Sequence, residues 1–373
     1  MVFQRSAVSA LVGKIRLSMK TEETPKTITL SRKERKLGGK ARVEEVKFLA
    51  AGAYNSVWLV ELDHPGEFSS LPGDTVDRFI IRLPCEDALL PNQVTNDVAF
   101  KRFVAENLPH VPVPKVYYYR ATDRADTSYM VEEYINSSTL SSIWMSLTHT
   151  QKDNIAQQLA NILVDMSEAR FDMIGGLDAR DLSSDPTVES GKLFKGRGQF
   201  HRDECYPIGP YKSTKEYILS CYDREIYYYS HAKDGVIDAD LFTEVTVQDF
   251  VETLKQEREA FTTKDIDDEP FVLVHGDLNG RNILAQGDKI TAILDWDFAG
   301  SYPLGEALTG GDLQVLEIDS EESYDETVAW ESKIRRYIQD EVEKRGWEQS
   351  HINTLLGDGN AELGKARMEM FPE

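Results

Sequence analysis

Residues 272–300 read VLVHGDLNGRNILAQGDKITAILDWDFAG, and this stretch decides how the chain is interpreted. It holds one histidine, four aspartates and two asparagines, and it lies between apolar runs rather than on a charged surface loop. Four polar residues stand beside segments that read as buried: His275, Asp277, Asn282 and Asp295. Burying a carboxylate costs several kcal/mol unless a partner compensates its charge. The partners must come from the rest of the chain or from a metal ion.

The spacing of these residues suits phosphoryl transfer. His275, Asp277 and Asn282 form the pattern H-x-D-x-x-x-x-N directly after the apolar stretch FVLV. Asp295 stands thirteen residues after Asn282, behind two short predicted strands joined by a Gly-Asp turn. Phosphoryl transfer needs a carboxylate that orients the attacking hydroxyl and accepts its proton, together with oxygen ligands for Mg²⁺. The alternative is that the aspartates serve only as turn and cap residues.

The sequence HGDLNGRNIL followed by ILDWDFAG resembles the aminoglycoside phosphotransferase and choline kinase group over about residues 43 to 310. The resemblance implies an α+β fold with two lobes, protein-kinase-like, in which a small strand-rich N-lobe precedes a larger helical C-lobe. It implies that Asp277 is the catalytic aspartate and that Asn282 and Asp295 hold Mg²⁺. His275 is expected to support the loop by packing and hydrogen bonding. Asn279 stands where many members carry histidine.

A glycine-containing turn and an ion pair are predicted earlier in the chain. Nucleotide phosphates need backbone N–H groups and a cation. The turn in AAGAYNSV, with Gly52 and Asn55 between two strands, is placed to cover them, although most such turns are only hairpins. Arg82 in FIIRLP stands where kinases carry lysine, and Asp97 stands where their glutamate is expected. The longer arginine and the shorter aspartate can compensate each other; the alternative is an ordinary surface ion pair.

The stretch SYMVEEYI is predicted to be a strand that leads into the connection between the lobes. By the resemblance, adenine hydrogen-bonds to backbone groups near Glu133, Tyr134 and Ile135. Two tyrosine runs, residues 117–119 and 227–229, are expected to pack in the core rather than to form a ligand cage.

Three segments are predicted from changes of pattern along the chain. Residues 1–42 read as a polar leader, 43–135 as the nucleotide-binding N-lobe with one helix near 93–108, and 136–373 as the catalytic and substrate-binding C-lobe. The first twenty residues carry four basic and no acidic side chains between apolar ones, which is typical of a mitochondrial transit peptide. A frayed tail can look the same, so we expect a cytoplasmic location, with a mitochondrial one as the alternative.

The overall composition restricts the partners. The net charge of −22 disfavours nucleic acid, because binding to a phosphate backbone needs a basic surface. No apolar run reaches the roughly 18 residues that a membrane-spanning helix needs. The three cysteines, Cys85, Cys205 and Cys221, are far apart, which fits a reducing compartment and gives no disulfide framework.

Seven acidic residues and no basic residue lie between positions 312 and 326. They are Asp312, Glu317, Asp319, Glu321, Glu322, Asp325 and Glu326. Either they form a solvated charged loop, or they form an acidic rim that suits a cationic hydroxyl substrate such as an aminoglycoside or an amino alcohol.

These observations predict a small-molecule kinase that uses Mg²⁺ and moves the γ-phosphate of ATP to a hydroxyl group. The alternative is a nucleotide-binding pseudokinase or scaffold, because Arg82 and Asp97 both depart from the usual kinase pair. The presence of Asp277, Asn282 and Asp295 argues against the scaffold, which needs none of them. The sequence does not name the phosphate acceptor.

Overall fold

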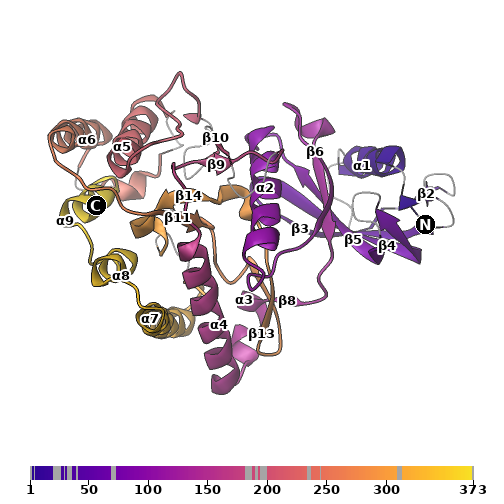
Figure 1. Ribbon diagram of the computed structural model, residues 1–373. Helices are drawn as coiled ribbons and strands as arrows, with labels where there is room; N and C mark the ends of the chain where they lie inside the picture. The colour runs from indigo at the N-terminus through magenta and orange to yellow at the C-terminus, as the bar shows by residue number, and fades with distance from the viewer. Residues whose placement is uncertain are drawn as a thin grey trace.

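The computed structural model describes residues 2–371 apart from 4, 20–26, 29, 32–35, 39–40, 69–72, 181–186, 190–191, 194–199, 233–236, 244 and 309–312. Within this part the chain forms two lobes, a strand-rich one on the right of Figure 1 and a helical one on the left. Each lobe has its own core: one cluster of buried apolar side chains comes from residues 8–131 and the other from residues 98–370. The predicted α+β arrangement is confirmed.

The strand-rich lobe is built on one mainly antiparallel sheet with the order β2-β3-β4-β5-β7-β6, and the short β1 pairs with β4 in parallel. Its strands are β1 Val2–Phe3, β2 Lys36–Gly38, β3 Ala41–Ala51, β4 Asn55–Phe68, β5 Thr75–Pro84, β6 Val116–Arg120 and β7 Tyr129–Glu133. In β5, Arg82 lies opposite Val57 on one side and Met130 on the other. Arg82 is therefore held by hydrogen-bonded strands on both sides.

One long helix of this lobe carries polar side chains on its buried face. The helix α2 (Asn92–Asn107) matches the prediction of a helix near residues 93–108. Ten of its sixteen residues are buried, and four of those ten are polar: Gln93, Asn96, Asp97 and Lys101. Because buried polar groups must be hydrogen-bonded, this face of α2 must meet partners rather than an apolar surface.

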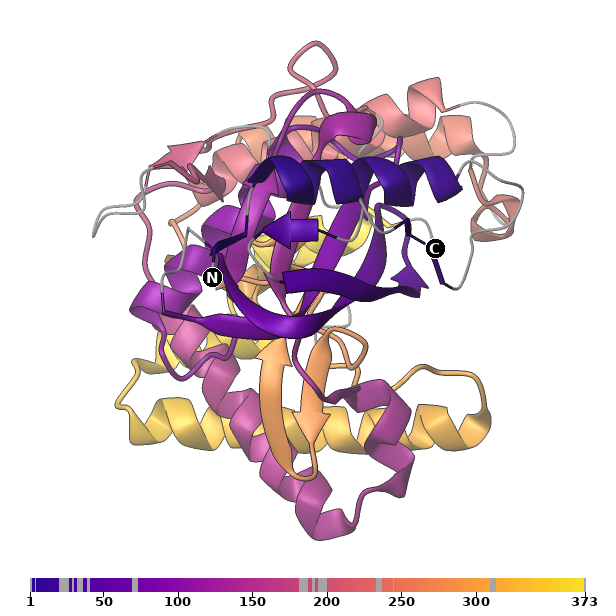
Figure 2. The ribbon, with the colours of Figure 1, turned by 90° about the vertical axis from the view of Figure 1, so that its right-hand side faces the viewer.

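The first residues of the chain differ from the prediction of a polar leader over 1–42. Residues Arg5–Met19 form the helix α1, which lies across the sheet in Figure 2. Its apolar side chains enter the core of the strand-rich lobe: Val8, Leu11, Val12 and Ile15. Arg16 Nη2 also donates to the carbonyl of Ser128 at 2.7 Å. The spacing that resembles a transit peptide is equally that of an amphipathic helix, and residues 5–19 pack on the strand-rich lobe rather than form a frayed tail.

The helical lobe follows from residue 138. Its helices are α3 Leu140–Ile143, α4 His149–Glu168, α5 Thr214–His231, α6 Val247–Thr262, α7 Glu321–Lys344, α8 Gln349–Leu356 and α9 Ala361–Glu369. Its strands are β8 Ser138–Thr139, β9 Gly176–Leu177, β10 Val188–Glu189, β11 Phe271–Val274, β12 Ile283–Gln286, β13 Lys289–Ile293 and β14 Gly300–Pro303. Short 3₁₀ turns lie in this lobe at Trp144–Ser146, Ala239–Leu241, Trp296–Phe298 (η5) and Leu304–Glu306, and between β6 and β7 of the strand-rich lobe at Ala125–Thr127.

Local sequence features explain two elements of the helical lobe, the helix α4 and the hairpin β12–β13. The helix α4 starts at a capping box, in which the Thr148 side chain and the Gln151 side chain each bond the other's backbone N–H. The hairpin β12–β13 turns at Gly287, whose φ of +62° favours glycine. Its register places Ile283 opposite Ile293. This register fixes how closely the ends of the hairpin approach each other.

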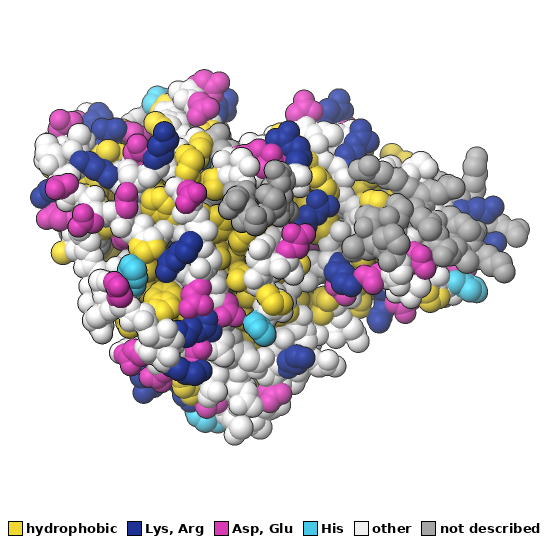
Figure 3. Space-filling view, in the orientation of Figure 1, with side chains coloured by type: hydrophobic (Ala, Val, Ile, Leu, Met, Phe, Trp, Pro, Cys, Tyr) yellow, Lys and Arg dark blue, Asp and Glu magenta, His cyan; other side chains and the backbone are white. Residues whose placement is uncertain are grey.

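The tyrosine runs pack as predicted. Tyr117 and Tyr118 are buried in the strand-rich lobe, and Tyr228 and Tyr229 are buried in the helical lobe. On the face shown in Figure 3, basic side chains are interspersed with acidic ones over both lobes. Among the described residues, no helix combines the length and the apolar character needed to cross a membrane.

Candidate active site

The loop after β11 positions the first candidate residue. Gly276 has a φ of +81°, and a Cβ there would lie 2.6 Å from the carbonyl oxygen of Phe298, so only glycine fits. Asp277, half-buried, follows at once, and its two carboxylate oxygens accept from Asn279 Nδ2 at 2.7 Å and from Asn282 Nδ2 at 2.8 Å. Burial and the negative charge of Asp295 raise the pKa of Asp277. The carboxylate is thus oriented on both sides by amide donors.

His275 supports this loop and is not placed to exchange protons with a substrate. Its ring is buried, its Nε2–H donates to the carbonyl of Leu294 at 2.9 Å, and its Nδ1 accepts from the Asp277 N–H at 3.2 Å. The ring also packs edge-on against Trp296, with 4.6 Å between the ring centroids. Burial lowers the pKa of His275 to about 4, so the imidazole is neutral near pH 7. The predicted supporting role agrees with these contacts.

Asn282 and Asp295 are brought together by the hairpin. The N–H of Leu294 donates to the carbonyl of Asn282 at 2.7 Å, so residue 282 and residue 295 stand at the same end of β12–β13. The Asn282 Nδ2 donates to both the backbone and the side chain of Asp277, which turns its amide oxygen away from that loop. Within the described ranges, no hydrogen bond of the protein is recorded to that oxygen. Amide and carboxylate oxygens are the ligands that Mg²⁺ prefers, so the pair fits the predicted metal site.

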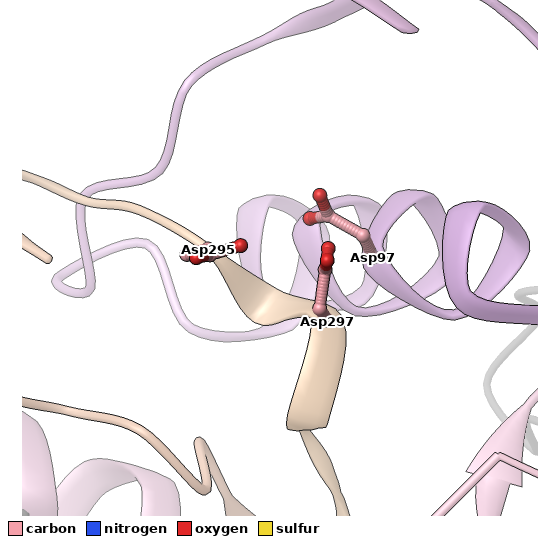
Figure 4. Close-up of side chains that lie close together, drawn as sticks. All are labelled: Asp97, Asp295 and Asp297. Atoms are coloured by element: carbon pink, nitrogen blue, oxygen red, sulfur yellow. The ribbon is translucent and has the colours of Figure 1, made fainter. Parts of the chain in front are cut away.

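Asp295 is held in an unusual backbone conformation. Its φ of +61° is the only positive value at a non-glycine residue within the described chain. Such a conformation costs roughly 1–2 kcal/mol for an L-residue, although Asp and Asn tolerate it better than most. The conformation directs the Asp295 carboxylate toward those of Asp97 and Asp297 (Figure 4). The three residues can bring one oxygen each to within 4.8 Å of one another.

The guanidinium of Arg82 contacts all three of these converging carboxyl groups. Its Nη1 donates to Asp97 at 2.6 Å, and its Nη2 donates to Asp295 at 2.5 Å. Asp297 lies 3.4 Å from the same Nη2. The side chains of Arg82 and Asp97 are 7% and 1% exposed. The predicted pairing of Arg82 with Asp97 is therefore confirmed, and the alternative of a surface ion pair is excluded.

Asp297 is a further site residue that the sequence analysis did not single out. Its Oδ2 accepts from Asn55 Nδ2 at 2.8 Å and from Gln93 Nε2 at 2.7 Å. Its backbone carbonyl accepts from Asn96 Nδ2 at 3.1 Å. Burial and the charge of Asp295 raise the pKa of Asp297. Through these bonds Asp297 joins the turn before β4, the helix α2 and the segment that carries Asp295.

The glycine-containing turn folds against that same segment. The Gly52 N–H donates to the carbonyl of Asn55 at 2.9 Å, and the ring of Tyr54 meets that of Phe298 at a centroid distance of 5.8 Å. A Cβ added at Gly52 would find no heavy atom within 4 Å. Gly52 is exposed and the space beside it is open, while Asn55 of the same turn reaches Asp297.

Some of the backbone groups that were predicted to bind adenine already form hydrogen bonds within the protein. The N–H of Glu133 donates to the carbonyl of Lys115 at 2.9 Å, and the carbonyl of Ile135 accepts from the N–H of Ser137 at 2.9 Å. Both groups are already used within the protein. The peptide groups of Tyr134, between these two residues, are the better candidates for hydrogen bonds to a base.

Gly280 is expected to be essential for stability, whereas Gly52 is not. Gly280 donates its N–H to the carbonyl of Gln314 at 2.8 Å, and a Cβ there would fall on the carbonyl oxygen of Val315. Gly280→Ala should therefore lower the free energy of unfolding by about 1–3 kcal/mol, the usual cost of overpacking. Gly52→Ala is the matched control and should stay within about 0.5 kcal/mol. Urea unfolding of the two variants checks this, and equal destabilisation would contradict it.

Arg82 and Asp97 are expected to act as one unit in nucleotide binding. Arg82→Lys should weaken ATP binding, because an ammonium cannot bond two carboxylates in the planar geometry of a guanidinium. Asp97→Glu should partly restore binding, since the longer acid follows the shorter base. A double-mutant cycle of ATP affinities should give a coupling energy above about 0.5 kcal/mol.

The control for this cycle is the exposed pair Arg124 and Asp126, changed to Lys and Glu. That pair should show no coupling to ATP affinity. Additive effects of the Arg82 and Asp97 substitutions would show that they do not function as a pair.

The fold and this site define a kinase-like protein: a strand-rich lobe carries the buried cation, and a helical lobe carries the aspartate and asparagine loop. The profile of the phosphotransferase enzyme family matches residues 45–306. The chain belongs to this family. A search of curated proteins found no match.

Two solved structures of aminoglycoside phosphotransferases are similar to this chain. A thermostable mutant of the aminoglycoside phosphotransferase APH(4)-Ia, in ternary complex with ADP and hygromycin B, is 15% identical with a TM-score of 0.50. The similarity covers 88% of this chain and 84% of that one. The streptomycin–ATP complex of APH(2″)-IIa is 13% identical with a TM-score of 0.42, over 88% of this chain and 91% of that one.

Proposed function

We propose that the protein is an ATP-dependent phosphotransferase that moves the γ-phosphate to a hydroxyl group of a small molecule. The observation that carries the proposal is the grouping of Asp277, Asn282 and Asp295 at one end of the β12–β13 hairpin, facing the buried Arg82. Family membership and the nucleotide complexes of the structural relatives support it.

In this proposal each group has a separate task. Asp277 orients the acceptor hydroxyl and accepts its proton, since its carboxylate is fixed by Asn279 and Asn282. Asn282 and Asp295 hold Mg²⁺, which would neutralise charge on the transferred phosphoryl group. Arg82 and the turn at Gly52 and Asn55 bind the phosphates. The adenine lies against the connection at Glu133–Ile135.

We propose that the acceptor binds in an acidic groove beside the catalytic loop. The groove has a volume of about 470 Å³ and is lined by Ser141, Ser142, Met145, Leu316, Glu317, Asp319, Ser320, Glu322 and Ser323. It borders the catalytic loop, because the N–H of Ser141 donates to the carbonyl of Gly280 at 2.9 Å. Three lining carboxylates favour a cationic hydroxyl compound over a neutral sugar.

The acidic stretch at 312–326 divides into different parts. The groove is lined by Glu317, Asp319 and Glu322. In contrast, Glu326 accepts a hydrogen bond from Trp144 and forms an ion pair with Lys152. Asp312 lies outside the described residues. Glu317 lies 3.7 Å from Arg281, so part of its charge is balanced within the protein. The acidic rim is therefore narrower than the sequence suggested.

One contact favours the second candidate, a nucleotide-binding scaffold. The guanidinium of Arg82 already neutralises Asp295, the candidate metal ligand. A scaffold could keep this ion pair permanently, whereas an enzyme must loosen it when metal and nucleotide bind.

The test is transfer of labelled γ-phosphate from ATP by the purified protein to aminoglycosides, choline, ethanolamine and neutral sugars. Transfer to a cationic member, reduced by Glu322→Gln, supports both the reaction and the groove. Transfer to a neutral sugar alone would reject the cationic acceptor. ATP binding without transfer to any acceptor and without ATP hydrolysis would favour the scaffold.

A further inference from the structure

Lys101 is a second buried cation close to the site, and the reaction as proposed does not use it. It lies one turn after Asp97 on α2, and its side chain is 1% exposed. Its Nζ lies 2.9 Å from Asp97 Oδ1 and 2.6 Å from Glu132 Oε2. Burial opposes the charge of Lys101, but the carboxylates of Asp97 and Glu132 outweigh it and hold the pKa of the ammonium above its ordinary value. Lys101 is therefore a charged group inside the protein.

The contacts form a continuous chain of alternating charge. Arg82 bonds Oδ2 of Asp97, Lys101 donates to the same Oδ2 at 3.2 Å and lies 2.9 Å from Oδ1, and Lys101 also bonds Glu132. Glu132 belongs to β7 and directly precedes the connection at Glu133–Ile135. The chain thus runs from the cation at the candidate phosphate site, through α2, to the strand at the candidate adenine site.

The geometry shows what Lys101 does to Asp97. A carboxylate that faces a guanidinium alone tends to bind it with both oxygens, because the two planar groups match. Here Lys101 Nζ lies 2.9 Å from Oδ1 and donates to Oδ2 at 3.2 Å, so Asp97 shares its carboxylate between Lys101 and Arg82, and Arg82 bonds Oδ2 alone. The second nitrogen of Arg82 is left to bond Asp295.

The balance of buried charge gives a second reason to expect that Lys101 affects Arg82. The side chains of Asp97, Glu132 and Asp297 are all buried, and Arg82 and Lys101 are the two buried cations that contact them in the described chain. Without Lys101, Arg82 would be the single cation among three buried carboxylates. It would be held more firmly by the protein and would be less able to bind phosphate.

We propose that Lys101 is a positioning residue that keeps Arg82 available for the nucleotide phosphates by sharing the carboxylate of Asp97 with it. This inference rests on the proposed function. It adds a residue that acts through Asp97 and does not itself touch the nucleotide.

The test compares affinities for ATP and for adenosine, which lacks the phosphates. Lys101→Met should lower the ratio of ATP affinity to adenosine affinity by at least about tenfold, the value of one charge-assisted hydrogen bond. If Lys101 were only structural, Lys101→Met would lower stability and leave this ratio unchanged. Lys365→Met is the matched control, since Lys365 also bridges two carboxylates, those of Glu257 and Glu369, but at the exposed surface.

A second variant separates stability from positioning. Lys101→Met leaves Glu132 without its cation, so the double variant Lys101→Met with Glu132→Gln should recover thermal stability. It should not recover the affinity ratio, because Arg82 remains the only cation beside the Asp97 carboxylate among the described residues. A parent-like ratio in this folded double variant would overturn the proposal.

Glu132→Gln alone keeps the test decisive if the lysine variants do not fold. Lys101 still has Asp97 in this variant, so the ratio should stay near that of the parent. A tenfold fall would show that the chain acts through β7 instead, which would reject the assignment. If the parent itself binds ATP no more tightly than adenosine, the proposed function fails rather than the role of Lys101.

Discussion

Asp295→Ala is expected to abolish Mg²⁺-dependent nucleotide binding and phosphoryl transfer while leaving a folded protein. The carboxylate stands at the end of the hairpin beside Asn282, where the two side chains offer hard oxygen ligands. A metal ion supplies several kcal/mol of charge stabilisation, so its loss should lower the rate by about a hundredfold to a thousandfold. Titration of ATP binding with Mg²⁺ by calorimetry checks the metal assignment independently of turnover.

The backbone at Asp295 calls for a companion variant. With a φ of +61°, alanine adds strain at this position, whereas asparagine tolerates the left-handed region. Asp295→Asn should therefore keep the stability of the parent and still lose most of the Mg²⁺ dependence. Asp288→Asn, at the exposed turn of the same hairpin, is the matched control and should change neither. An unchanged response to Mg²⁺ in both Asp295 variants would remove the metal assignment.

The arrangement of the loop that carries Asp277 could be predicted from the sequence because its parts are local. Asp277 and Asn282 belong to one loop, and the turn at Gly287 sets a register that returns the chain to Asp295. Only one tight turn and one strand pairing have to be inferred for these groups to meet. The partner of Arg82 could be predicted by the resemblance, although the burial of the pair could not.

The remaining polar residues of the candidate site could not be predicted from local sequence patterns. Asp297 meets Asn55 and Gln93, which lie 242 and 204 positions away in the chain. A polar residue that will be buried looks the same in the sequence as one that will be exposed. The helix α2 shows the difficulty, because its buried surface carries Gln93, Lys101 and other polar groups beside its apolar residues. Its periodicity alone would place those side chains in solvent.

The contacts of Arg82 explain how an arginine can stand where kinases carry lysine. A lysine ammonium is a compact charge, whereas the planar guanidinium of Arg82 can bond Asp97 and Asp295 through two different nitrogens. The shorter Asp97 leaves room for this longer base. The arginine therefore does not imply a degenerate site, because it links the helix α2 directly to the candidate metal ligand.

Asp277→Asn is expected to separate catalysis from binding. The transition state of phosphoryl transfer is loose, so this aspartate orients the hydroxyl and accepts its proton rather than binding ATP. Asparagine has nearly the same shape and is a poor proton acceptor. The variant should bind Mg²⁺·ATP about as tightly as the parent and lose on the order of a hundredfold or more in rate, the scale of a lost general base. Single-turnover rates and nucleotide affinities of the same preparations provide the measurement.

The local hydrogen bonds predict one further effect of this substitution. Asp277 accepts amide donors from both Asn279 and Asn282, and the new Nδ2 of asparagine would have to face one of them as a second donor. A small loss of stability is therefore expected, and it can be measured separately by thermal unfolding. If the variant transfers phosphate at the parent rate, Asp277 is not the catalytic residue. If the rate falls while the affinity for Mg²⁺·ATP is kept, the scaffold interpretation fails, because a scaffold has no turnover to lose.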